Sequence, residues 1–179
     1  MFCSACGSVL PQTPPVKCLS CGVGHWLNAK PAACALVMQN HKLLLIRRST
    51  EPWLGAWDIP GGFCDEKEHP LLAAEREAFE ETGLRVHVTG FLGIWMDIYS
   101  AGPNEQPKST LNTFYHAVPE GNGQEARVSE EASEVRWFQP DELPANIAFP
   151  ASQLPALAAW RECLAQGQTV TPLLDRATI

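Results

Sequence analysis

Apolar and polar residues alternate with two different periods along the chain, and the change of period predicts where the elements lie. Apolar runs at 32–38 and 43–47 predict two strands. The four residues 39–42 between them predict a hairpin turn, because Asn40 tolerates the left-handed region. Over residues 70–83 the period becomes helical, with Pro70 suited to a first turn and Gly83 to a C-terminal stop.

Further elements follow on both sides of this helix. Short strands are predicted at 57–59 and 135–138, and longer ones at 86–98, where Gly90 and Gly93 interrupt the pattern, and at 110–118. An amphipathic helix is predicted at 154–164. This order of strands, one internal helix, more strands and a terminal helix predicts an α+β domain.

Composition and charge narrow the class of protein. The 179 residues are 45% apolar and carry 13 Lys and Arg against 20 Asp and Glu, a formal charge of −7, which is typical of a globular domain. No apolar run approaches the roughly 18 residues of a spanning helix, and the N-terminus lacks the basic and apolar regions of a secretory signal. We therefore expect a cytoplasmic protein with no membrane partner, and the acidic balance argues against a nucleic-acid partner.

Four of the seven cysteines form two Cys-x-x-Cys-Gly pairs, Cys3 with Cys6 and Cys18 with Cys21. This spacing lets two tight turns direct four thiolates at one ion, and such a set suits tetrahedral Zn²⁺. Two disulfides or four free thiols are the alternatives, and a reducing compartment disfavours the first of them.

Residues 1–30 contain few apolar side chains besides the cysteines, so we expect this segment to fold as a small four-cysteine zinc ribbon that depends on its metal. Four thiolates leave no open position for a substrate, which indicates a structural role. The segment carries Lys17 and Lys30 and no acidic residue, a charge too small to indicate a nucleic-acid footprint.

Three carboxylates share one face of the predicted helix at 70–83. Glu77, Glu80 and Glu81 fall within roughly 100° of its circumference. A solvated acidic face is the ordinary explanation of such a cluster, but like charges at these spacings repel one another. Converging carboxylates are the ligands that Mg²⁺ or Mn²⁺ requires, so we expect a divalent metal site here.

The pattern around this helix resembles a known motif. The chain reads Gly62, five residues, Glu68, seven residues, Arg76-Glu77, Ala78, Phe79, Glu80-Glu81, Thr82, Gly83, Leu84. This resembles the Nudix box, G-x5-E-x7-R-E-U-x-E-E-x-G-U, at every charged and glycine position, and only Ala78 is smaller than the usual residue.

The resemblance implies a fold and a domain division. Nudix proteins have an α/β/α sandwich with a mixed β-sheet, so we expect a Nudix domain at 31–145 after the ribbon at 1–30. The segment 146–179 would be a helical extension packed on that domain.

The resemblance also implies roles for individual residues. Nudix hydrolases cleave the diphosphate of a nucleoside diphosphate linked to another moiety. By position, Glu77, Glu80 and Glu81 would hold Mg²⁺ or Mn²⁺. The Gly61 carbonyl would complete the metal's ligands, Glu68 would bind through water, and Arg76 would orient the glutamates.

The general base is less defined, because members of the family recruit it from different places. Glu77 could accept the proton of the attacking water. Glu131, in the loop before the predicted strand at 135–138, is the second candidate, with Glu130 and Glu134 next to it.

A zinc ribbon before a Nudix domain resembles the organisation of NADH, FAD and ADP-ribose pyrophosphatases, which implies a dinucleotide or ADP-ribose as the small-molecule substrate. NADH pyrophosphatases also carry S-Q-P-W-P-F-P-x-S after the box, and this chain has a different sequence there, at 88–100. The candidate substrate contacts are Trp57 and Tyr99, chosen from four nearby aromatic residues, and Arg47, chosen from a basic group that also contains Lys42 and Arg48.

A second function class is a binding module, in which the zinc ribbon engages a protein or RNA and the Nudix site is weak or vestigial. The intact box speaks against it. Family members often form homodimers, so the resemblance also makes a homodimer an expectation.

Overall fold

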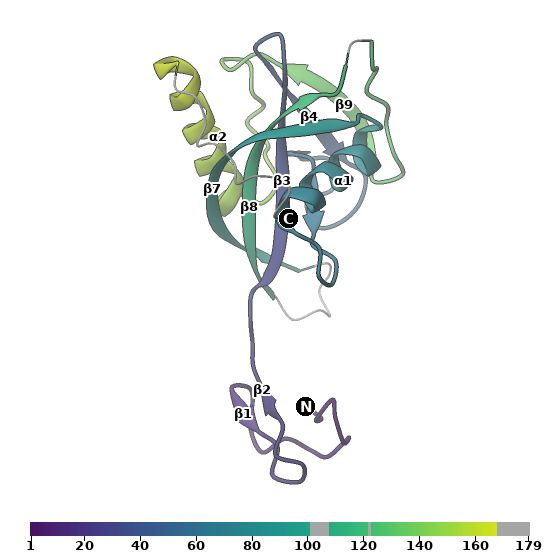
Figure 1. The fold of residues 1–179 in the computed structure, drawn as a ribbon, viewed down its shortest axis with the longest axis vertical. Helices are drawn as coiled ribbons and strands as arrows, with labels where there is room; N and C mark the ends of the chain where they lie inside the picture. Colours follow the sequence, from purple (N-terminus) through teal and green to yellow (C-terminus); the bar gives the residue numbers. More distant parts are fainter. Residues whose placement is uncertain (101–107, 122, 168–179) are drawn as a thin grey trace.

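The computed structural model describes residues 1–100, 108–121 and 123–167, and it places a small N-terminal unit beside a larger domain (Figure 1). In the N-terminal unit, β1 (Val16–Lys17) and β2 (Gly24–His25) pair antiparallel. Its buried cluster is formed by Cys3, Leu10 and Cys18. Within the described chain, no helix combines the length and apolar character needed to span a bilayer.

A mixed sheet of seven strands forms the larger domain. Its strands are β3 (Lys30–Gln39), β4 (Lys42–Arg48), β5 (Trp57–Asp58), β6 (Gly61–Phe63), β7 (Val86–Tyr99), β8 (Lys108–Pro119) and β9 (Ala132–Phe138). The order is β5-β4-β3-β8-β7, with β6 paired to β3 and β9 paired to β4. The pairing of β3 with β8 is parallel, and the other pairs are antiparallel.

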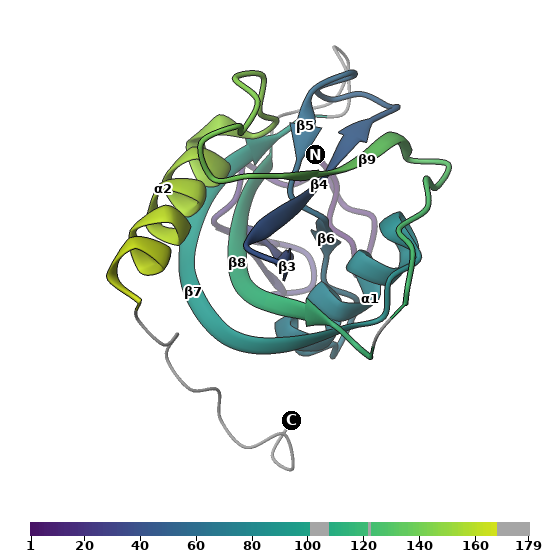
Figure 2. The same cartoon turned by 90° about the horizontal axis from the view of Figure 1, so that it is seen from above.

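Two helices cover opposite faces of this sheet (Figure 2): α1 (Pro70–Thr82) and α2 (Pro150–Gln166). On β3, Ala33 and Val37 belong to the core cluster on the α1 side, whereas Leu36 belongs to the cluster that contains Trp160 of α2. Both faces of β3 are therefore buried, which explains its continuous apolar run. The arrangement confirms the expected sandwich with a mixed sheet.

Most predicted elements are present, with shifted ends. The hairpin between β3 and β4 turns through Asn40 and His41, whose φ angles are 51° and 62°. Helix α2 begins at Pro150 rather than at residue 154, and Pro155 lies inside it. Strand β6 was not predicted, because glycine is depleted in strands and two of its three residues are Gly. It forms because β3 offers it a partner, with Ala33 opposite Gly62.

Candidate active site

Helix α1 presents the three glutamates of the box. His69 caps its N-terminus by accepting a hydrogen bond from the Leu71 amide at 3.2 Å, and Gly83 ends it in the left-handed conformation with φ 70°. Glu81 is 5% exposed, the Glu77 side chain 15% and the Glu80 side chain 54%. The stripe predicted from the sequence is thus graded in depth, with Glu81 innermost.

Arg76 connects four groups around these glutamates. Its guanidinium donates to both oxygens of Glu68 at 2.8 and 2.9 Å, to Glu77 at 2.8 Å and to Glu80 at 2.9 Å. It also donates to the carbonyl of Phe63 at 3.0 Å. A planar guanidinium with five donors suits this task. Arg76 is thus in contact with three of the predicted site glutamates, and its role in orienting them stays a prediction.

Gly61 and Gly62 bring the backbone of β6 against α1. The amide of Gly61 donates to Oε2 of Glu81 at 2.9 Å. A Cβ atom at Gly62 would lie 2.5 Å from Oε1 of Glu77, and one at Gly61 would lie 2.5 Å from the carbonyl oxygen of Ala33. At Gly61 the close approach of backbone therefore requires glycine, whereas at Gly62 a larger residue would displace the carboxylate of Glu77. The amide of Gly61 is therefore tied to Glu81, and the role of its carbonyl as a metal ligand stays a prediction.

Burial and charge act differently on these carboxyl groups. Burial raises the pKa of Glu77, and it raises that of Glu81 well above the usual value, helped by the nearby charge of Asp58. Hydrogen bonds from Arg76 instead lower the pKa of Glu68 to about 2. Glu68 is also fixed by the Asp65 amide at 2.9 Å. A cation beside Glu77 and Glu81 would offset the cost of burying their charge.

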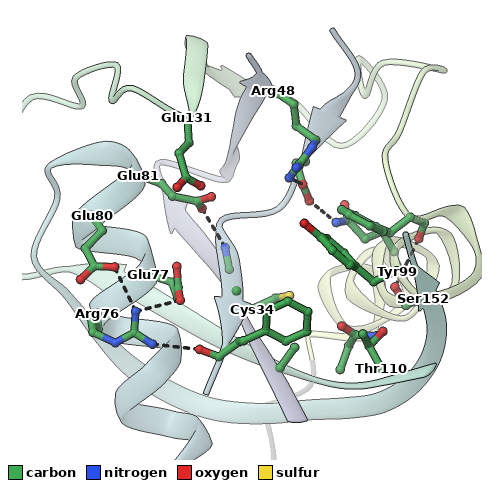
Figure 3. A pocket seen from close by; sticks show the side chains of 18 of the residues that line it. Cys34, Arg48, Arg76, Glu77, Glu80, Glu81, Tyr99, Thr110, Glu131 and Ser152 are labelled. Carbon is green, nitrogen blue, oxygen red and sulfur yellow. Dashed lines mark hydrogen bonds and ion pairs between the residues drawn. The ribbon is translucent and has the colours of Figure 1, made fainter. Parts of the chain in front are cut away.

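These carboxylates form one wall of a cavity of about 450 Å³ (Figure 3). Arg48, Tyr99 and Ser152 lie on the opposite wall, across from Glu77, Glu80 and Glu81. Asp58, Phe149 and Gln153 also line the cavity, so residues from β4, β5, β7 and the start of α2 contribute to it.

The predicted substrate contacts divide into one that lines this cavity and two that do not. Tyr99 lines it. Trp57 is 8% exposed and packs edge to face against Phe138 in the core, with ring centroids 4.8 Å apart. Arg47 points away, donating to the Gly55 carbonyl at 3.0 Å and pairing with Glu134 at 3.8 Å.

The choices of Trp57 and Arg47 are therefore corrected, because alternation along a strand turns neighbouring side chains to opposite faces. Arg48, the next residue, is the basic side chain of this strand that lines the cavity. Phe149, Ser152 and Gln153 were missed, since no motif or spacing connects the start of α2 with the box.

Glu131 lies where the sequence placed the second candidate base. It lines the main cavity and also a second one of about 340 Å³, which it shares with the three box glutamates, Ser129 and Glu130. The loop is held by Ser49, whose amide donates to the carbonyl of Glu131 at 3.0 Å and whose hydroxyl donates to that of Glu130 at 2.7 Å.

The donors of the glutamate wall are oxygens, as a hard divalent cation requires. The arrangement is more open than that of the cysteines: among the described residues, Cys3, Cys6, Cys18 and Cys21 form the only group of three or more His, Cys, Asp or Glu residues whose ligand atoms all lie within 4.8 Å of one another. Arg76 lies between Glu77 and Glu80. The carboxylates that face the cavity are thus suited to a metal by chemistry and by their common wall.

The four cysteines of the N-terminal unit fit zinc more closely. The Sγ atoms of Cys3 and Cys21 are 3.6 Å apart, and those of Cys6 and Cys18 are 3.7 Å apart. A tetrahedron with Zn–S bonds of ~2.3 Å separates its sulfurs by roughly 3.8 Å. These distances are far longer than a disulfide bond. His25, which the sequence analysis did not single out, lies 3.2 Å from Sγ of Cys3 through Nε2.

Comparison with known proteins places this geometry in a family. The NUDIX domain model matches residues 28–160. A MutT-like protein of Streptomyces ambofaciens is 30% identical over 122 residues, which cover 68% of this chain and 71% of that protein. An ADP-ribose pyrophosphatase of Methanocaldococcus jannaschii is 29% identical over 124 residues, 69% of each chain.

A third relative extends the match toward the N-terminus. The NAD-capped RNA hydrolase NudC of Stutzerimonas stutzeri is 29% identical over 155 residues, or 85% of this chain. The match spans about half of that relative, 51% of its length.

Among solved structures, a NUDIX hydrolase from Nitrosomonas europaea aligns over 95% of both chains with 28% identity and a TM-score of 0.76. The matched region contains the box, the cavity and most of α2. The chain belongs to the NUDIX family of hydrolases.

Proposed function

We propose that this protein is a Mg²⁺- or Mn²⁺-dependent pyrophosphohydrolase. Its substrate would be a nucleoside diphosphate linked to another moiety, a dinucleotide such as NAD(H) or FAD, or ADP-ribose. The products would be a nucleoside monophosphate and a second phosphorylated compound. The family and its hydrolase class come from the comparisons, while the metal and the substrate are the proposal.

The observation that carries the proposal is the wall of Glu77, Glu80 and Glu81 facing a cavity large enough for a nucleotide. These carboxylates are also held in position without a ligand, because Arg76 donates hydrogen bonds to Glu77 and Glu80 and the Gly61 amide donates one to Glu81. A divalent cation bound there would neutralise the diphosphate oxygens and lower the pKa of a bound water.

The chain's own residues would then do the remaining work. Glu77, Glu80 and Glu81 would hold the cation, with Glu68 and Arg76 keeping them in place. Glu131, at the junction of the two cavities, is our first choice to accept the proton of the attacking water, and Glu77 is the alternative. A base of this kind must come within hydrogen-bond reach of the attacking water, and Glu131 lines the same cavities as the box glutamates that would hold the metal.

The names of the relatives support the substrate class. The Methanocaldococcus relative is called an ADP-ribose pyrophosphatase, and the Stutzerimonas relative a hydrolase of NAD-capped RNA. Both names describe a diphosphate with a nucleoside on at least one side. The name of the Stutzerimonas relative adds an NAD-capped RNA to the substrates worth testing, even though the acidic charge of this chain disfavours a nucleic-acid partner.

We also propose the division into a zinc ribbon at 1–30, a catalytic domain at 31–145 and a segment at 146–179. The family match runs from 28 to 160, so it begins close to the end of the ribbon and includes the first part of α2. The cytoplasmic location and the absence of a membrane partner stay predictions.

The test is hydrolysis of NADH, NAD, FAD, ADP-ribose, a diadenosine polyphosphate, coenzyme A and an NAD-capped RNA, with and without Mg²⁺ and with products separated by chromatography. Glu80→Gln is the inactive variant, because Glu80 is the most exposed box glutamate and its replacement disturbs packing least. Glu142→Gln, at an exposed position that does not line the cavity, is the matched control.

We expect AMP release from one or two compounds, dependent on Mg²⁺, retained in Glu142→Gln and lost in Glu80→Gln. Turnover of no compound by the wild type would contradict the proposal. In that case the binding-module alternative, with a vestigial box, would take its place.

A further inference from the structure

The cavity wall opposite the glutamates is aromatic. Tyr99, the last residue of β7, and Phe149, the residue before α2, have ring centroids 6.1 Å apart with an interplanar angle of 15°. Phe63 meets Tyr99 edge to face at 5.3 Å. Tyr99 and Phe149 are partly exposed, and neither belongs to the core cluster that holds Trp57 and Trp160. Core packing therefore does not account for their position.

Phe149 holds a backbone conformation that is costly for a bulky residue, with φ 47° and ψ 57°. Its carbonyl accepts from the amides of Ser152 at 3.1 Å and Gln153 at 2.9 Å. The Ser152 amide also donates to Asp97 of β7 at 2.8 Å. Such strain persists only where surrounding contacts hold the backbone in place. Here these hydrogen bonds hold Phe149 so that its ring forms part of the cavity wall.

Buried polar contacts anchor the first turn of α2 to the sheet behind the cavity. The side chain of Gln153 donates to Asp58 and accepts from the Ile59 amide at 3.1 Å. Asp58 and Gln153 are 4% and 2% exposed. Because both ends of this contact are buried and paired, the position of Phe149 relative to β5 is well fixed.

Arg48 places a positive charge next to the same ring. Its guanidinium lies 5.2 Å above the Phe149 ring, and Nη1 pairs with Asp58 at 2.8 Å. Nε donates to the carbonyl of Pro52 at 2.7 Å. A cation on this wall attracts an anionic ligand, and its stacking helps to fix the ring.

We propose that Tyr99 and Phe149 bind the aromatic base of the nucleotide, so that the first turn of α2 determines which substrates are accepted. The inference rests on the proposed function, since it assigns the nucleoside half of the same substrate. The diphosphate would extend from these rings across the cavity to the glutamates, which Figure 3 shows on the opposite side from Tyr99.

The test replaces each ring by an aliphatic side chain, Tyr99→Leu and Phe149→Leu. Leucine is not β-branched, so it meets about the same left-handed backbone cost as phenylalanine at position 149. Tyr99→Phe keeps the ring and loses only the hydroxyl. Trp26→Leu, which removes a ring that is 72% exposed on the N-terminal unit, is the control.

Binding is measured by calorimetry with AMP, which carries a base, and with ribose 5-phosphate, which has the same phosphate and sugar without one. We expect both leucine variants to bind AMP roughly tenfold more weakly, because stacking on one aromatic side chain contributes that much. Binding of ribose 5-phosphate is expected to stay within about twofold of the wild type by the same reasoning. Trp26→Leu is expected to behave as the wild type, whereas Tyr99→Phe, which keeps a ring, is expected to bind AMP more tightly than Tyr99→Leu does.

Steady-state kinetics give an independent test, with the compound that the wild type hydrolyses most efficiently among those named under the proposed function. The leucine variants should raise KM with little change in kcat, because base binding is the same in the ground and transition states. Unchanged AMP affinity in variants that melt as the wild type does, or an equal loss for both ligands, would overturn the inference. If the wild type hydrolyses none of the compounds, the proposed function fails. The calorimetric comparison of AMP with ribose 5-phosphate still tests whether Tyr99 and Phe149 bind the base.

Discussion

Glu81 is the innermost of the box glutamates, and its surroundings differ from those of Glu80. It is 5% exposed and accepts from the Gly61 amide, and burial raises its pKa well above the usual value. We predict that Glu81→Gln removes nearly all metal-dependent turnover, with kcat falling at least about 100-fold, because charge stabilisation in the transition state is lost.

The fold should survive this change, since glutamine has nearly the same shape and its Oε1 can accept the Gly61 hydrogen bond. Thermal unfolding of the variant, with kcat measured on the same sample, checks both parts. A variant that keeps more than about a tenth of kcat would show that Glu81 is not a ligand of the metal.

Replacing each of the two adjacent glycines of β6 by alanine should affect different properties of the protein, activity at Gly62 and stability at Gly61. The three atoms nearest to a Cβ at Gly62 belong to the carboxylate of Glu77, which can rotate away, whereas a Cβ at Gly61 meets the backbone of Ala33 and Cys34 at 2.5 and 2.7 Å. We therefore predict that Gly62→Ala loses roughly 10- to 100-fold in kcat/KM with little change in Tm, because a displaced catalytic carboxylate is costly.

Gly61→Ala should instead lower Tm by several degrees, since strands β3 and β6 must separate to admit the methyl group. Melting curves and kinetics of the two variants side by side form the measurement. Equal loss of stability in both would show that Gly62 is required for packing rather than for the placement of Glu77.

At the scale of elements, the features that could be predicted from the sequence are those that depend on residues close together in the chain. The stripe of Glu77, Glu80 and Glu81, the limits of α1 and the left-handed turn at Asn40 all follow from neighbours a few residues apart. A longer-range contact, which such local pattern does not predict, is made by Glu75, which accepts from the amide of Val88 at 2.8 Å and so ties α1 to β7.

What depends on distant partners was not predictable. Trp57 is buried because it packs on Phe138 of β9, whereas Tyr99 lines the cavity beside Phe63 of β6 and Phe149. Phe149 reaches the site because α2 returns to the sheet through Gln153 and Asp58. Neither local propensity nor strand alternation carries this information.

Strand β8 contains a buried histidine whose environment disfavours its charge. His116 is 2% exposed, and neither ring nitrogen has a hydrogen-bond partner among the described residues. Burial lowers its pKa below the usual 6.5. The unfolded chain therefore binds a proton more readily than the folded one, and His116 costs stability as the pH falls below 6.5.

We predict that His116→Leu is about 1 kcal/mol more stable than the wild type at pH 7, because a buried polar group without partners is removed. The difference should grow as the pH falls below 6.5. Urea unfolding at pH 7 and at mildly acidic pH measures it, with His87→Gln, at an exposed site on β7, as the control. A variant that loses stability at both pH values would mean that the ring's packing outweighs its polarity.

At the scale of the whole molecule, the N-terminal unit and the catalytic domain have separate sources of stability. The catalytic domain has core clusters on both faces of its sheet, whereas the buried cluster of the N-terminal unit consists of Cys3, Leu10 and Cys18. So small an apolar core contributes little against chain entropy, so we expect a metal bound by the four thiolates to stabilise this unit. Figure 1 shows the two units joined through the chain that enters β3.

We therefore predict that removing zinc unfolds residues 1–30 and leaves the catalytic domain folded and active. The purified protein should contain one equivalent of zinc by elemental analysis, and chelation should make Cys3, Cys6, Cys18 and Cys21 reactive toward a thiol reagent. The chelator is then removed and Mg²⁺ restored before turnover is measured, since the chelator would also take the catalytic ion.

Replacing Cys3 and Cys21 by serine should reproduce the effect without a chelator. If turnover stayed lost after Mg²⁺ was restored, the N-terminal unit would have to support the active site indirectly, because none of the cavity's lining residues lies within residues 1–30.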